Sequence, residues 1–227
     1  MNDLRVELQY GIPPFRMALP PGWRRRAASS ETEKADLARA SQLFRQAGRP
    51  DLEAQYRAMM ARVRQGMARS KVFALYRQEE VEADELLPMS ITASAVEGED
   101  GANLDGWISD AFRTRGADFL EDAKHIVRWE GEAARAPRGA DIDKIPGRTI
   151  MYALPVPETN RTRALVFTTT ILTPDSAAIS DDAIRGMTVL SDLMISTVAW
   201  EQAVAEPATP DAGAGPDGEL SPSTDAR

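Results

Sequence analysis

The chain has 227 residues and a formal net charge of −8, and 43% of its residues are hydrophobic, which is enough to build the core of one sizeable domain. The acidic balance argues against general nucleic-acid affinity. The absence of cysteine excludes a disulfide framework, a thiolate zinc site and a cysteine nucleophile. No segment reaches the roughly 20 apolar residues of a membrane-spanning helix. Residues 1–7 also lack a basic segment leading into an apolar one, so we expect a cytoplasmic protein.

The first predicted strand covers residues 15–19, because Pro13 and Pro14 exclude a helix there and apolar side chains alternate along it. The sequence Pro20-Pro21-Gly22-Trp23 then predicts a turn. Trp23 has two interpretations. We expect it to plug one end of the core, the commoner role of such an aromatic, and the alternative is a loop that binds a partner through Trp23.

Residues 30–69 predict a helical hairpin. Gly48 suits the end of the first helix, and Pro50 suits the first position of the second. Apolar residues recur in the second helix at the spacing of one buried face, at Leu52, Tyr56, Met59, Val63 and Met67. We expect this stripe to be core. The opposite face carries the candidate partner-binding residues Arg57, Arg62, Arg64 and Arg69.

Charge is distributed unevenly along the chain. Residues 24–77 contain 13 lysines and arginines and 5 acidic residues, a balance of +8, whereas residues 79–122 contain 13 acidic residues and 2 basic ones. One interpretation is a basic surface that docks an acidic partner or a membrane surface. The other, which we favour, is a solvated arginine face that the neighbouring acidic segment balances in the fold.

Further strands are predicted at residues 71–78, 89–95, 125–129, 149–154 and 163–172, and further helices begin near Asn103 and at Ser180. The strand at 89–95 alternates apolar and hydroxyl side chains, as in an antiparallel sheet with one wet face. We predict an α+β fold: a single domain over residues 1–200 with an antiparallel sheet of about six strands, flanked by helices, and the hairpin as an insertion. Residues 201–227 predict a disordered acidic tail rich in proline, alanine and glycine.

The chain offers few groups for catalysis. His125 is the single histidine, and it has no partners at a recognised metal-site spacing. No nucleophile elbow and no phosphate-binding loop is present. We therefore predict a protein that is not an enzyme and has no cofactor or metal. The alternative is a small-molecule binding domain or a hydrolase that uses a polar groove of hydroxyl residues on the sheet, at 90–94 and 168–170.

Two segments resemble a known superfamily. The sequence Phe15-Arg16-Met17-Ala18-Leu19-Pro20-Pro21-Gly22-Trp23 resembles the opening strand and turn of the PsbP-like α/β/α sandwich, and Leu165-Val166-Phe167-Thr168-Thr169 with Val198-Ala199-Trp200 resembles its closing half. That superfamily includes DcrB-like and LpqN-like proteins and effector-associated chaperones. The resemblance implies a non-enzymatic protein-interaction module, an adaptor or chaperone for a bacterial secretion or effector system. Its partner would be a protein, acidic or a secreted effector.

Removal of residues 202–227 tests the expected tail. A polar segment with almost no large apolar side chains buries little surface on folding, so the melting temperature should stay nearly unchanged. Differential scanning calorimetry of the full and shortened chains measures this. A drop of several degrees would show that the tail packs on the domain.

Overall fold

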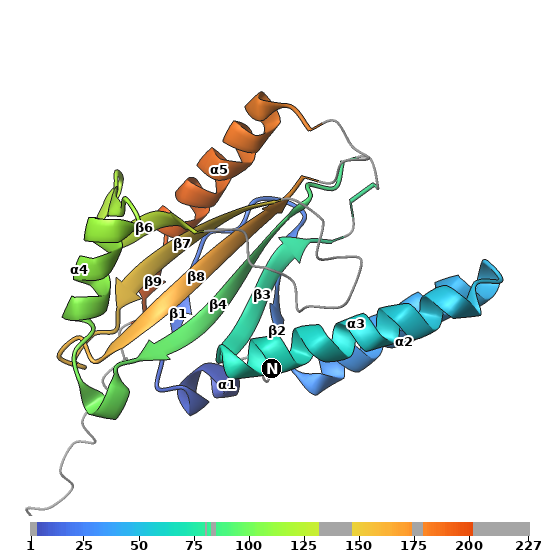
Figure 1. Ribbon diagram of the computed structural model, residues 1–227, viewed down its shortest axis with the longest axis horizontal. Coiled ribbons are helices and arrows are strands. Elements are labelled where there is room, and N and C mark those ends of the chain that lie inside the picture. The colour runs from blue at the N-terminus through green and yellow to red at the C-terminus, as the bar shows by residue number, and fades with distance from the viewer. Residues whose placement is uncertain (1–3, 80, 83–84, 132–146, 174–178, 202–227) are drawn as a thin grey trace, which may run out of the picture.

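The computed structural model describes residues 4–79, 81–82, 85–131, 147–173 and 179–201. Its centre is a seven-stranded sheet in the order β2-β3-β4-β8-β7-β6-β5, and a two-stranded ladder joins β1 to β9 (Figure 1). The strands are β1 (Phe15–Arg16), β2 (Trp23–Ala27), β3 (Val72–Gln78), β4 (Met89–Glu97), β5 (Asp118–Leu120), β6 (Ala123–Gly131), β7 (Gly147–Pro155), β8 (Arg163–Leu172) and β9 (Ala199–Trp200). The helices are α1 (Leu4–Gln9), α2 (Ser30–Gln46), α3 (Pro50–Arg69), α4 (Asp105–Thr114) and α5 (Asp181–Ser196), with a 3-10 turn η1 (Glu99–Gly101).

All neighbouring strands of the sheet are antiparallel, so the predicted antiparallel sheet flanked by helices is confirmed. Side chains alternate between two faces, which we name the α5 face and the α4 face after the helix on each. Phe167 lies opposite Ala93 and Tyr152 on the α5 face. The next residue, Thr168, lies opposite Thr92 on the α4 face. The expected alternation of buried and wet residues along β4 is therefore present, with Met89, Ile91, Ala93 and Ala95 buried.

The α5 helix covers the main core. Its Met187, Met194 and Ile195 are buried among the apolar side chains of β3, β4, β7 and β8. The predicted cap is confirmed, because Ser180 Oγ accepts a hydrogen bond from Ala183 N at 3.2 Å. The helix ends at Ser196.

Polar groups under α5 are joined in one network. The Tyr152 hydroxyl donates to Asp192 Oδ1 at 2.6 Å and lies 2.9 Å from Ser191 Oγ. Ser191 Oγ in turn lies 2.6 Å from Thr169 Oγ1, and Asp192 accepts from Arg128 Nε at 2.9 Å. Burial raises the pKa of Tyr152, so its hydroxyl remains a donor. These bonds satisfy polar groups that would be costly to bury unpaired, and they fix how α5 is rotated on the sheet.

The N-terminal segment closes the α5 side of the molecule. Phe15 pairs with Trp200 and Arg16 with Ala199, and Glu201 N donates to Pro14 O at 2.8 Å. The predicted strand at 15–19 is therefore wrong in two respects: it pairs over two residues, and it lies outside the main sheet. Its alternation is nevertheless real, because Phe15, Met17 and Leu19 all pack on the main core.

The main sheet instead begins at β2, which sequence patterns missed. Three successive arginines at positions 24–26 conceal its alternation, in which Trp23 and Arg25 are more buried than Arg24 and Arg26. The short β5 and the helix α1 were also not predicted. In α1, Glu7 is buried and forms an ion pair with Arg25 of β2, and such a contact between distant segments is invisible to local patterns.

The predicted turn at residues 20–23 is confirmed. Trp23 N donates to Pro20 O at 3.1 Å, and Gly22 has a φ of +79°, a value that favours glycine. Trp23 itself is only 2% exposed and belongs to the main core. The alternative of a binding loop that presents Trp23 to a partner is therefore wrong, because almost none of the side chain can be reached.

The α4 helix covers a second, smaller core on the opposite face of the sheet from α5, toward the edge formed by β6 and β5. Leu104 and Ala111 lie with Trp129 and Val166, and the Trp107 ring meets that of Trp129 edge-on at 5.5 Å. This packing reaches β6, β7 and one end of β8. The α4 face is thus apolar at one edge and carries hydroxyl side chains along its middle.

Within the described residues, every helix is too short or too polar to cross a lipid bilayer. The predicted tail at 201–227 lies outside the described residues, apart from Glu201.

The substitution Met194→Asp tests the packing of α5. Met194 is 3% exposed, so the new carboxylate would be buried without a partner, and we expect a loss of more than about 4 kcal/mol in the free energy of unfolding. The neighbouring Leu193 is 53% exposed, so Leu193→Asp is the matched control and should cost little. Urea denaturation measures both, and equal losses would contradict this placement of α5.

Candidate functional site

The predicted hairpin is confirmed as α2 and α3, which lie side by side and extend beyond the edge of the sheet (Figure 1). Gly48 (φ +66°) and Pro50 make the turn, as expected. The helices pack on each other, with the Phe44 and Tyr56 rings 5.7 Å apart. The base of α3 contacts β3. The hairpin therefore joins the domain at one end and presents most of its length to solvent.

The apolar stripe of α3 is not core, which corrects the expectation. No residue of α3 is buried: Tyr56, Met59 and Met67 are partly covered, and Val63 is 38% exposed. On α2, Leu43 is 59% exposed. Two helices cannot enclose a core between them, so the hairpin keeps accessible apolar surface.

The four candidate arginines of α3 do not form one face. Arg57 donates to Glu53 on its own helix at 2.8 Å, and Arg69 donates to the Gln65 carbonyl. Arg57 and Arg64 line a groove on the hairpin, whereas Arg62 is half-buried. The structure thus brings Arg57 and Arg64 together in one groove, which residues of α2 also line.

We name this groove the hairpin groove. It has a volume of about 460 Å³ and is lined by Lys34, Leu37, Ala38, Ser41, Arg45, Arg57, Ala61 and Arg64. Four of these residues are basic and none is acidic. The floor is held by Ser41, whose Oγ accepts from Arg57 at 3.3 Å and whose carbonyl accepts from Arg45 at 3.2 Å. Hydrogen bonds from Ser41 and Arg57 lower the pKa of the adjacent Glu53, so its charge remains to orient Arg57.

A second cavity lies where the hairpin meets the sheet, and we name it the base pocket. Its volume is about 220 Å³. Apolar groups make most of its wall, from Ala27, Ala28, Met60, Val63, Met67, Ala68, Val72 and Leu75. Polar groups at its rim come from Tyr10, Arg26, Ser29, Asp36, Arg64 and Arg77. Arg64 lines both the base pocket and the hairpin groove, so the two cavities border the same side chain.

Ion pairs hold the rim of the base pocket. Arg77 reaches Asp36 of α2 and Glu79, each at 3.1 Å, and Arg26 of β2 donates to Glu79 Oε1 at 2.9 Å. The hydrogen bonds from Arg26 and Arg77 lower the pKa of Glu79. The acidic segment therefore balances basic residues at the base of the hairpin, as the favoured interpretation expected. Along α3, residues 54–69 contain four arginines and no acidic residue, and Arg57 pairs with Glu53 of its own helix instead of the acidic segment.

The hydroxyl residues of the sheet border a third, open groove of about 770 Å³, which Ser90 and Thr170 line. Other hydroxyls of this face are engaged with the backbone: Thr92 donates to the Thr168 carbonyl and Ser94 to that of Val166. His125 lies exposed on β6 and lines none of these three cavities. The Ser, Asp and His125 convergence that the hydrolase alternative needs is not found among the described residues. Nor do these residues gather three metal-ligating side chains at one place.

Comparison with known proteins adds no relative: no family model, no curated protein and no solved structure matches the chain. The PsbP-like resemblance stays a prediction that rests on its two short segments.

Sequence patterns did not find the base pocket, because its lining residues run from Tyr10 to Arg77 and are spread over 68 positions. One signal was present: the three arginines at 24–26 contrast with the apolar core strands and mark β2 as an edge strand with polar contacts. Which residues of α2 and α3 face β2 across the pocket depends on how the hairpin packs against the sheet, and local sequence patterns do not show this.

The substitution Glu79→Gln tests the electrostatics of the rim. A carboxyl whose pKa is lowered in the fold stabilises it above the ordinary value of 4.5, and this contribution is lost as pH falls through the lowered pKa. We therefore expect the variant to be less stable than the wild type at neutral pH, with the gap closing below pH 4.5. Urea denaturation at a series of pH values measures the gap.

The matched control is Glu99→Gln, on an exposed turn. A gap for Glu79→Gln that does not vary with pH would show that the carboxylate charge is not what Arg26 and Arg77 recognise.

Proposed function

We propose that this protein is a protein-interaction module that docks an acidic segment of a partner protein on its helical hairpin. The observation that carries the proposal is the exposure of α3, a helix of 20 residues on which no residue is buried. Helices of this kind draw most of their stability from packing of an apolar face. A partner that covers the hairpin would supply the packing that the domain itself does not.

Charge supports an acidic partner. The hairpin groove has four basic side chains and no acidic one in its lining, although the whole chain is acidic. Guanidinium groups bind carboxylates with paired hydrogen bonds, which gives geometric specificity as well as attraction. An acidic chain as a whole is repelled from nucleic acid, so a protein carboxylate is the better match.

The same charges disfavour a second copy of this hairpin as the partner. Two hairpins packed groove to groove would bring eight basic side chains together, and like charges at such distances are destabilising. The finer proposal, an adaptor or chaperone for a bacterial secretion or effector system, draws its support from the PsbP-like resemblance alone.

Charge reversal of the hairpin tests the proposal. Peptides selected from a random display library on the wild-type protein should be rich in Asp and Glu. Their affinity should fall about tenfold or more when the basic residues of the groove, Lys34, Arg45, Arg57 and Arg64, are all changed to Glu. The reason is that each exposed charge contact contributes about 0.3–0.5 kcal/mol and is also reversed. Fluorescence anisotropy at two salt concentrations measures this, and affinity should weaken at high salt.

The matched control reverses four exposed arginines elsewhere, at positions 113, 115, 161 and 185, with the same change in net charge. Circular dichroism confirms that both variants fold. Selected peptides without acidic residues, or equal losses in both variants, would overturn the proposal.

A further inference from the structure

We infer that the base pocket is an anchor site for one large apolar side chain, aromatic or branched, within the acidic segment that the hairpin groove binds. This inference rests on the proposed function and names the chemistry of the partner segment. Carboxylates of that segment would meet the basic side chains of the hairpin groove, and the apolar residue would enter between α3 and the β2–β3 edge.

The size and lining of the pocket fit a single side chain. A cavity of about 150 Å³ with aliphatic walls takes up benzene, so the 220 Å³ of the base pocket can take an aromatic or branched side chain. Met60 and Met67 stand in its wall. Methionine is flexible and polarisable, which suits a wall that adapts to an entering group.

The pocket is unlike ordinary internal packing. Protein interiors fill space at crystal-like density and leave few voids larger than a water molecule. Here a mostly apolar cavity stays open at the junction of two elements, and Val63 at its edge is 38% exposed. An apolar cavity with a charged rim is the arrangement in which a buried anchor residue contributes most to protein binding.

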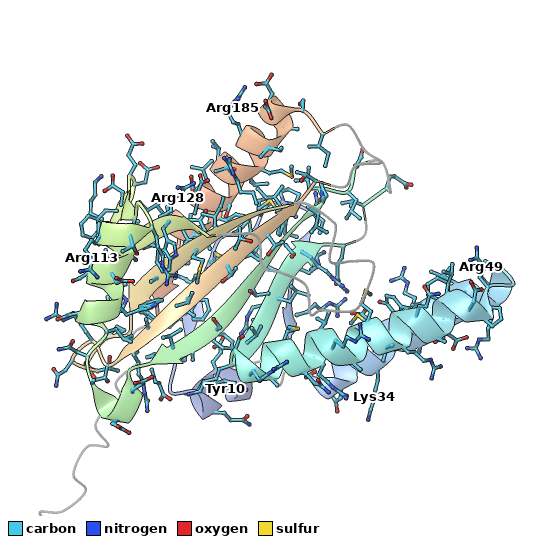
Figure 2. All side chains as sticks on the ribbon, viewed as in Figure 1. Tyr10, Lys34, Arg49, Arg113, Arg128 and Arg185 are labelled. Carbon is cyan, nitrogen blue, oxygen red and sulfur yellow. The ribbon has the colours of Figure 1, made fainter. Side chains whose placement is uncertain are left out.

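The rim explains why the anchor should sit among acidic residues. Asp36 and Glu79, the carboxylates at this end of the hairpin, are held by Arg77 and Arg26. Arg64 stands between the pocket and the hairpin groove. Figure 2 shows that Tyr10 lies at the base of the hairpin, that Lys34 lies on α2 at the same end, and that Arg49 lies at the far tip. Because Arg64 borders both cavities, a short segment that contacts Arg64 can reach the pocket on one side and the groove on the other.

Three fluorescein-labelled peptides test the inference: Glu-Asp-Glu-Phe-Glu-Asp-Glu, the same sequence with Gly in place of Phe, and the same with every acidic residue changed to Lys. Burial of the phenylalanine should make the first peptide bind about tenfold or more tighter than the Gly peptide. The Lys peptide should bind more weakly than both. Binding of the Phe peptide should also shift the methyl NMR signals of Met60 and Met67.

A filled pocket gives the decisive comparison. Val63→Trp places a large ring at the pocket edge and should remove the advantage of the Phe peptide while leaving the Gly peptide unchanged. Leu43→Trp is the matched control, because Leu43 is exposed on α2 and lines none of the three cavities, and it should keep that advantage. Melting temperatures confirm that both variants fold.

The outcomes separate the two proposals. Equal binding of the Phe and Gly peptides, both lost on reversal of the four basic residues of the hairpin groove, overturns the anchor pocket and leaves the proposed function standing. Equal binding of the Phe and Lys peptides overturns the acidic partner. Absence of binding by both acidic peptides overturns the proposed function and the anchor site with it.

Discussion

The continuous antiparallel pairing of β4 with β8, from Met89 opposite Ile171 to Glu97 opposite Arg163, is the constraint on which the rest of the structure depends. Because side chains of paired strands alternate together, the pairing sends apolar residues to one face and hydroxyl residues to the other. The apolar face is stable only when it is shielded from water. Helix α5 shields it with three buried apolar side chains and is held by a hydrogen-bond network centred on Tyr152. The N-terminal segment then seals that side by pairing with β9.

The α4 face, which carries the hydroxyl side chains, needs less covering because these groups can stay in contact with water. Helices cover it only at its two edges. The α4 helix packs on β6 and β7, and the base of α3 packs near β3. Hydroxyl side chains that bond to strand carbonyls, such as Thr92 and Ser94, tolerate water and need no helix above them. The cavities of this face consequently lie beside the middle strands and at the foot of the hairpin.

The hairpin combines two kinds of surface that seldom remain exposed together. Among the described residues, nothing buries the apolar stripe of α3, and residues 54–69 of this helix contain four arginines and no acidic residue. Acidic residues of later segments neutralise the base, where Glu79 meets Arg26 and Arg77 and where Glu97 meets Lys71 and Arg163. Beyond the base, the hairpin groove is lined by four basic side chains and no acidic one, and one of the four, Arg57, is paired with Glu53 of its own helix.

The sequence by itself determined the α+β class, the hairpin and five strands of the sheet. These features follow from the local spacing of apolar residues, from Gly and Pro at the ends of elements and from a serine N-cap. It also located the basic module from charge alone. The tertiary structure decided what periodicity cannot express: that Trp23 is sealed in the core, that residues 15–16 pair with residues 199–200, and that the stripe of α3 is left half-covered. The base pocket belongs to this second group, because its walls come from distant segments and exist only once the hairpin has folded against the edge of the sheet.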